Sequence, residues 1–161
     1  MMKKTNFLLL ILGLAILIGC KPDEPESIGD RFDTVEGING SWVIDRVEVV
    51  DETLPVPETR DISDYFISKT NKVGMSFNTS NKTYTIDNAQ EPANPFGASG
   101  IYTINDPKYP SQLTLYSVSQ DTIEMDLTNM VRSIDPYMGY KIKKEACGGV
   151  YASYIYTFRR L

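Results

Sequence analysis

The stretch TIEMDL at residues 122–127 decides the fold class, because its polar and apolar residues alternate with a period of two. Successive side chains of a β-strand point to opposite faces, so Ile123, Met125 and Leu127 are expected to face a core while their polar neighbours face water. A strand with one buried and one solvated face is typical of an antiparallel sheet. This stretch therefore predicts an antiparallel β-protein.

Similar short runs, rich in Val, Ile, Thr, Tyr and Phe, continue from Ile38 to the end of the sequence, with Asn, Gly, Pro and Asp between them. Such spacing is typical of strands joined by tight turns. Besides residues 122–127, the strong runs are 42–50, 73–77, 82–86, 100–104, 112–118 and 150–159, and a weaker run lies near 140–143. Loops such as residues 78–81 favour hairpins, which predicts a meander, and only residues 62–68 favour a helix.

Seven or eight meandering strands leave two unpaired edges, and closure into a barrel removes both. We therefore expect an all-β fold, an antiparallel eight-stranded barrel with one short helix, and we keep a β-sandwich as the alternative. A chain of this length suits one such domain. The last run, residues 150–159, is semi-apolar on both faces. This pattern indicates a strand that is also covered on its outer face, or a barrel with a partly open interior.

The beginning of the chain carries an export signal. Lys3 and Lys4 precede an apolar run at residues 7–18, and the sequence LIGC occupies residues 17–20. A charged start, a short apolar run and a small residue before the cut are the parts of a secretory signal peptide. A cysteine at the cut can be acylated. We expect residues 1–19 to be a lipoprotein signal peptide and Cys20 to carry the lipid anchor.

Residues 20–37 are acidic and contain proline, so we expect an acylated, flexible tether before a barrel domain at residues 38–161. The acidic residues behind Cys20 resemble the signal that sends some lipoproteins of Gram-negative anaerobes to the outer face of the outer membrane. A tether that is simply hydrophilic is the alternative. The expected location is the bacterial outer membrane, with lipid anchoring and exposure at the cell surface.

The composition argues against several classes of function. Histidine is absent from the 161 residues, which removes the usual general base and the usual zinc ligand. The net charge of −5 and an extracytoplasmic location argue against a nucleic-acid partner. With Cys20 acylated, Cys147 is expected to be a small buried or neutral residue, and a reactive or intermolecular thiol is the alternative. We expect a monomer with no enzymatic activity, catalytic residue, cofactor or metal.

Gly40-Ser41-Trp42 opens the first strong run and resembles the Gly-x-Trp start of the lipocalins and related calycin barrels. The remainder resembles the lipocalin-like domains of bacterial surface lipoproteins, many of unknown function. This resemblance implies that Trp42 plugs the closed end of the barrel and that an arginine near the last strand, Arg159 or Arg160, lies across its ring. The second-loop aspartate motif of the family has no clean counterpart, and a barrel hosts many activities.

Tyrosines on the expected strands are candidate ligand-binding residues, because each joins an apolar ring to a hydroxyl group. Phe96, on a proline-stiffened loop, is a candidate at the barrel mouth, with a role as a lid of the core as its alternative. The candidate set is Tyr84, Phe96, Tyr102, Tyr116, Tyr154 and Tyr156. Ordinary packing of tyrosine on strands is the alternative for the tyrosines.

The sequence thus predicts a membrane-anchored, non-catalytic domain that binds a small hydrophobic or glycan-like ligand. The alternative is an accessory or interaction module of an outer-membrane uptake or envelope complex, docking on another outer-membrane protein. A hydrolase that uses two carboxylates, such as Glu124 and Asp126, is a third alternative. A hollow interior favours the small-molecule binder, and a filled barrel with an exposed apolar patch favours the interaction module.

Overall fold

The computed structural model describes residues 33–67, 72–89, 94–119 and 122–161. Its helices are α2 (Thr34–Ile38) and α3 (Ser63–Phe66). Its strands are β1 (Gly40–Asp51), β2 (Glu58–Asp61), β3 (Gly74–Asn78), β4 (Thr83–Asp87), β5 (Gly100–Ile104), β6 (Gln112–Ser117), β7 (Thr122–Leu127), β8 (Tyr137–Ala146) and β9 (Gly149–Arg160).

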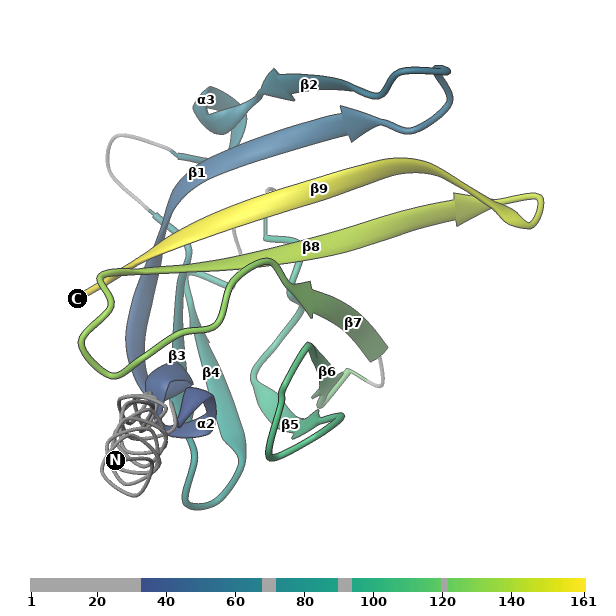
Figure 1. Ribbon diagram of the computed structural model, residues 1–161. Helices are drawn as coiled ribbons and strands as arrows, with labels where there is room; N and C mark the ends of the chain where they lie inside the picture. Colours follow the sequence, from purple (N-terminus) through teal and green to yellow (C-terminus); the bar gives the residue numbers. More distant parts are fainter. Residues whose placement is uncertain (1–32, 68–71, 90–93, 120–121) are drawn as a thin grey trace, which may run out of the picture. The chain divides into compact units, whose positions relative to one another are not determined.

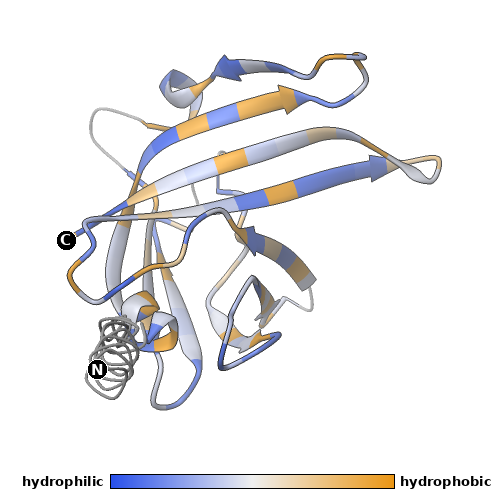
Figure 2. Cartoon of the chain, in the orientation of Figure 1, coloured by the Kyte–Doolittle hydropathy of each residue, from blue (hydrophilic) through white to orange (hydrophobic). Residues whose placement is uncertain are grey.

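Eight antiparallel strands of the described chain close into a barrel, in the order β1-β3-β4-β5-β6-β7-β8-β9, and β9 pairs back onto β1. The expected antiparallel eight-stranded barrel is therefore confirmed, and the sandwich does not form. Along β7 the buried Met125 lies between the polar Glu124 and Asp126, and Figure 2 shows the alternation of hydropathy along this strand. The alternation of polar and apolar residues that predicted a β-sheet thus also separates the buried face of β7 from its solvated face.

Three strands of the barrel are much longer than the rest. β1, β8 and β9 extend past β5, β6 and β7, and β2 lies along the extended half of β1 (Figure 1). We call this extension the projecting sheet; it comprises β2 with residues 48–51 of β1, 142–146 of β8 and 150–155 of β9. Its inner face continues the face that lines the barrel, because β1 and β9 belong to both.

Neither β2 nor the full length of β8 was expected from the sequence. All four residues of β2 are exposed, and the sequence ETRD offers no apolar alternation. β8 carries Lys141, Lys143 and Lys144, which weaken its strand signal, but it pairs with β9 from Tyr137 to Ala146. Cross-strand pairing stabilises a charged strand that has little strand propensity of its own.

The two helices are short. α3 lies within the stretch at residues 62–68 that favoured a helix. α2 was not expected, because residues 34–37 fall within the stretch assigned to the tether. Asp33 caps it, as the Glu36 backbone N–H donates to the Asp33 carboxylate over 3.1 Å, and Ile38 at its end is fully buried. Cys20 and the rest of residues 1–32 lie outside the described residues.

Cys147 lies at the tip of the β8–β9 hairpin and is exposed, so the expected buried position is wrong. The hairpin has a two-residue turn, in which Cys147 has a φ of 52° and Gly148 a φ of 81°. Two positive φ values define the tight type I′ turn, which matches the twist of the flanking strands. The turn explains why Gly148 follows the cysteine, and it exposes the thiol.

Candidate functional site

The closed end of the barrel is built around Trp42. Its ring is fully buried, and its indole N–H donates to the carbonyl oxygen of Ile38 over 2.9 Å. The guanidinium of Arg160 lies 4.1 Å from the ring centroid. Arg159 points elsewhere and faces Asp45 over 3.6 Å, with its side chain 45% exposed. Of the two candidates, Arg160 is therefore the arginine that lies across the tryptophan.

Arg160 also fastens two separate segments together. It donates to the carbonyl oxygens of Gly37 over 2.7 Å, Asn39 over 2.9 Å and Asp135 over 3.1 Å. The first two carbonyls belong to the junction between α2 and β1, and the third belongs to the loop before β8. The fork of the guanidinium suits several acceptors at once. The closed end is therefore a structural plug, with no room left for a ligand beside the indole.

Glycine at position 40 is required by the same contact. Gly40 has a φ of 112°, a region that side-chain-bearing residues rarely adopt. A Cβ atom there would lie 3.3 Å from Nη1 of Arg160. Gly40 thus provides both the positive φ that the backbone adopts here and the space beside the Arg160 guanidinium.

Aromatic rings fill the middle of the barrel. The Phe77 ring on β3 lies 5.2 Å from Tyr102 on β5 and 6.4 Å from Tyr140 on β8, measured between ring centroids. β3 and β8 are not neighbours in the sheet, so this last contact crosses the lumen. All three rings are at most 3% exposed. Side chains of the barrel therefore occupy the space where an enclosed ligand would lie.

Phe96 closes the aromatic core. It is fully buried, 5.1 Å from the Tyr156 ring and 5.6 Å from the Phe158 ring. The Asn94 side chain holds the loop in place, because it accepts from the Phe96 backbone N–H over 3.0 Å and donates to the Gly97 carbonyl over 2.7 Å. The burial of this ring agrees with the alternative of a lid of the core. A ligand contact of Phe96 stays a prediction.

The interior tyrosines are uncharged. Burial raises the pKa of Tyr102, of Tyr140 and of Tyr156. The Tyr140 hydroxyl donates to Sδ of Met138 over 2.9 Å. The Tyr102 hydroxyl has no hydrogen-bond partner among the described residues. These phenols therefore stay protonated at any physiological pH and offer no phenolate for catalysis.

The predicted tyrosines do not form one site. Tyr84, Tyr102 and Tyr156 lie inside the barrel. Tyr154 is partly buried, 6.4 Å from Tyr156 in a stacked arrangement, where the interior gives way to the projecting sheet. Tyr116 lies on the outer wall and is 41% exposed. None of these tyrosines lines the groove on the inner face of the projecting sheet, although Tyr154 pairs with Val49, which does.

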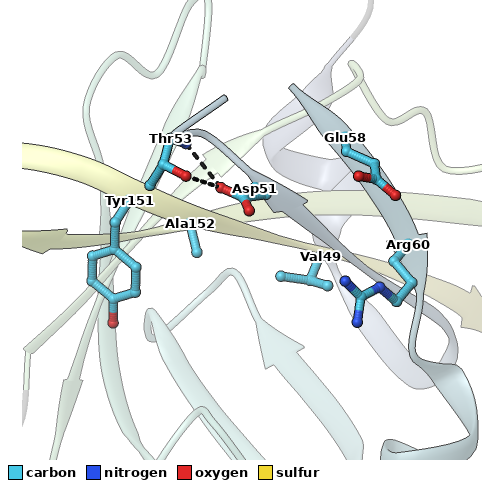
Figure 3. Close-up of a pocket in the computed structure, with 7 residues that line it drawn as sticks. All are labelled: Val49, Asp51, Thr53, Glu58, Arg60, Tyr151 and Ala152. Carbon is cyan, nitrogen blue, oxygen red and sulfur yellow. Dashed lines mark hydrogen bonds between the residues drawn. The ribbon is translucent and has the colours of Figure 1, made fainter. Parts of the chain in front are cut away.

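That inner face carries a groove of about 350 Å³ beyond the barrel (Figure 3). We call it the projecting-sheet groove, and Val49, Asp51, Thr53, Glu58, Arg60, Tyr151 and Ala152 line it. Val49 pairs with Arg60 on one side and with Tyr154 on the other. The groove thus begins two residue pairs beyond the fully buried Val47, which pairs with Tyr156 inside the barrel.

The groove combines an apolar floor with polar edges. Val49 and Ala152 form the floor, and the Tyr151 ring, 47% exposed, stands at one side (Figure 3). The Asp51 carboxylate accepts from the Thr53 backbone N–H over 2.9 Å and from its hydroxyl over 2.6 Å, and these bonds lower the pKa of Asp51. Asp51 is therefore ionised at neutral pH, and its Oδ1 atom accepts both hydrogen bonds from Thr53.

Two more charged groups come from β2. Glu58 and Arg60 project from this strand toward the groove (Figure 3). Neither forms an ion pair within 4.0 Å with another residue of the described chain. Both side chains are exposed. Glu58 can therefore accept hydrogen bonds, and Arg60 can donate them, beside the apolar floor.

Only partial signals for these residues are present in the sequence. Val49 lies in the first strong run, and Tyr151 and Ala152 lie in the last, whose two semi-apolar faces indicated an open interior or a covered exterior. Neither run by itself places its residues beside β2. A bulge at Lys144 and Glu145, opposite Tyr151, also shifts the parity of that tyrosine. The groove could therefore not be assembled from the sequence.

No family model, no curated protein and no solved structure matches this chain. Within the described ranges, acidic residues and cysteine form no group of three or more that could hold a metal ion. In the same part of the chain, no helix is long and apolar enough to cross a membrane. The fold and the groove together define a closed antiparallel β-barrel with an external groove.

Proposed function

We propose that this chain is a membrane-anchored, non-catalytic binding protein. The filled interior argues against the ligand site expected inside the barrel, so the proposed ligand lies in the projecting-sheet groove. The observation that carries this proposal is the position of the groove, an open space of about 350 Å³ directly beyond an interior filled with rings. Ligand pockets usually measure about 300 to 1,000 Å³ and combine apolar walls with a few polar groups. The groove has both properties.

The lining indicates the class of ligand. Val49 and Ala152 offer a surface for an apolar group, and Tyr151 offers a ring for stacking. Glu58 and Arg60 offer an acceptor and a donor for hydroxyl groups at the edge. A small amphipathic compound with an apolar part and a hydroxylated head, such as a glycolipid fragment, fits this arrangement.

The lipocalin-like identity of the barrel is part of the proposal. Gly40, Trp42 and Arg160 support it, because their contacts at the closed end are those that the resemblance implies. Anchoring through Cys20, location in the outer membrane and exposure at the cell surface rest on the sequence of residues 1–37. Replacement of Cys20 by Ala should release the protein from the membrane fraction, and protease treatment of intact cells should report its exposure.

Octyl β-glucoside, used below its critical micelle concentration, is a suitable probe because it joins an apolar chain to a sugar. We expect calorimetric titration to detect binding, and amide shifts in NMR spectra to move at Val49 and Ala152. Tyr151→Ala should weaken binding by about two- to tenfold, since an aromatic contact contributes roughly 0.5–1.5 kcal/mol. Ala152→Phe should fill the groove and abolish binding.

Tyr116→Ala is the matched control, because it removes an equally exposed tyrosine from the outer wall. It should leave the affinity for octyl β-glucoside unchanged. Equal effects of Tyr116→Ala and Tyr151→Ala, or binding that survives Ala152→Phe, would contradict the proposal.

The interaction module remains a second candidate, because the filled barrel carries an exposed apolar pair on its outer wall. Ile101 on β5, 55% exposed, pairs with Tyr116 on β6, and the uncharged Thr83 and Thr122 flank them in register. A photo-crosslinking amino acid at position 101 should capture an envelope protein in intact cells if this wall is an interface. Capture from position 60 alone would exclude this wall.

A further inference from the structure

The barrel wall is incomplete between β7 and β8. Their ladder consists of two residue pairs and stops at Asp126 and Lys141, although both strands continue beyond it. Continuing the register would pair Glu124 with Lys143, and the structure has no such pair, although both residues are described. Four residues of β7 and five of β8 therefore have an edge without a strand partner within the described chain.

The backbone groups on these edges point into the gap. The Thr128 backbone N–H donates to the Gly139 carbonyl over 2.9 Å. This hydrogen bond shows that Thr128 and Gly139 direct their backbone groups toward each other, across the line between β7 and β8. In an antiparallel ladder, every second residue turns its N–H and C=O to the same neighbour. Glu124 on β7 and Lys143 on β8 therefore present both groups to the gap, as Asp126 and Lys141 do where the strands meet.

A cavity of about 390 Å³ occupies this gap, and residues of both strands together with Pro95 line it. Ile123 and Ile142 stand on the barrel side, while Glu124 and Lys143 stand on the outer side. The edges of β7 and β8 thus form two opposite sides of the opening. Apolar and charged side chains alternate along these edges.

We propose that this gap binds an extended peptide segment of a partner protein, which adds a strand between β7 and β8. Backbone donors and acceptors that repeat every second residue, roughly 6.8 Å apart, are met by another extended backbone and not by a compact small molecule. The inserted segment runs antiparallel to β8 and consequently parallel to β7. This surface is distinct from the projecting-sheet groove, and the proposal does not depend on it.

The charges beside the gap indicate the composition of the segment. The Lys143 ammonium pairs with the Asp126 carboxylate over 2.6 Å, and Glu124, Lys144 and Glu145 also line the cavity. Because both signs border the gap, a neutral polar residue meets less repulsion there than a charged residue does. The expected segment alternates Ser or Thr on the outer side with Val or Ile over Ile123 and Ile142.

The probe for the experiment is the synthetic peptide acetyl-TVSVTVS-amide. Hydrogen exchange followed by NMR should show rapid exchange of the Glu124 and Lys143 amides in the free protein, because these N–H groups have no strand partner among the described residues. Addition of the peptide should slow both amides. Exchange that is already slow in the free protein would mean that the gap is closed in solution, and the proposal would be wrong.

Two variants of one position separate the backbone from the side chain. Lys143→Pro removes the N–H that faces the gap and leaves the bonds of its neighbours to β9. Lys143→Ala removes the side chain and its ion pair but keeps the N–H. We expect Lys143→Pro to weaken peptide binding by about tenfold relative to Lys143→Ala, the effect of one lost backbone hydrogen bond.

A peptide methylated on alternate backbone nitrogens tests the same bonds without altering the protein, which covers the case in which Lys143→Pro does not fold. This peptide should not bind. Absence of binding by the unmodified peptide, equal affinity of the two peptides, or equal affinity of the two folded variants would overturn the proposal.

Discussion

Arg160 carries more structural connections than any other side chain at the closed end described above. It lies over Trp42 and donates to three carbonyl groups in two segments. Arg160→Lys keeps the charge but loses the planar fork and several of these bonds. We expect the free energy of unfolding, measured with urea, to fall by about 1–3 kcal/mol.

Arg159→Lys is the control for that measurement, because Arg159 is exposed and faces Asp45 over 3.6 Å. An exposed ion pair contributes about 0–1 kcal/mol, so the change should stay near 0.5 kcal/mol or below. Equal losses in the two variants would show that the contacts of Arg160 do not stabilise the fold.

Cys147 provides a test of backbone strain at the β8–β9 turn. A cysteine with a φ of 52° is strained, whereas asparagine tolerates this region and is preferred before glycine in type I′ turns. Cys147→Asn should therefore raise the free energy of unfolding by roughly 0.5–1 kcal/mol. Cys147→Ser removes the thiol and keeps the strain, so it should leave stability unchanged, and a gain of the same size in both variants would assign the effect to the thiol.

At the residue scale, the sequence predicts which residues build the closed end better than it predicts which of them are in contact. The Gly-x-Trp sequence pointed to Gly40 and Trp42, but it could not choose between Arg159 and Arg160. The choice depends on register, because Arg160 pairs directly with Trp42 and shares its face. A shift of one residue would have exchanged the two arginines, and no local pattern near residue 160 fixes that register.

Glu52 ties the elements of the projecting sheet together. Its carboxylate follows β1 and accepts from the Ser153 hydroxyl over 2.7 Å on β9 and from the Lys141 ammonium over 3.0 Å on β8. These two hydrogen bonds, that of Ser153 first, lower the pKa of Glu52. The ionised carboxylate is therefore the form that stabilises the folded protein.

The lowered pKa predicts how stability depends on pH. A group whose pKa is lower in the folded state contributes stability above its unfolded pKa, about 4.3 for glutamate, and loses it as the pH falls through the folded value. Glu52→Gln should therefore lower stability at pH 7 and flatten its decrease below about pH 4.3. Urea unfolding across this range measures both effects. An unchanged acid slope would show that Glu52 has the same pKa in both states.

At the element scale, strands with apolar alternation were predictable and charged strands were not. β7 is evident from residues 122–127, whereas β2 consists of four exposed residues whose pairing with β1 determines their conformation. The groove depends on β2 for Glu58 and Arg60. It was therefore hidden from sequence analysis for the same reason as the strand itself.

At the scale of the whole molecule, closure could be predicted and the filling of the barrel could not. Closure removes the unpaired edges of a meander whatever the side chains are, so it could be favoured over a sandwich in advance. Alternation shows which residues face inward, but it does not show whether Phe77 on β3 reaches Tyr140 on β8 across the lumen. That contact depends on the diameter and stagger of the barrel, which are properties of all eight strands together.

Phe96→Ala tests the filled interior directly. Removing a fully buried ring that packs on Tyr156 and Phe158 should lower the free energy of unfolding by about 3–5 kcal/mol and leave an apolar cavity. An apolar cavity of this kind stays dry and binds benzene. Benzene should therefore raise the melting temperature of the Phe96→Ala variant and leave that of the parent protein unchanged, because in the parent the phenylalanine ring occupies the same space. Stabilisation of both proteins by benzene would show that the parent barrel is already hollow, and would return the ligand from the projecting-sheet groove to the interior.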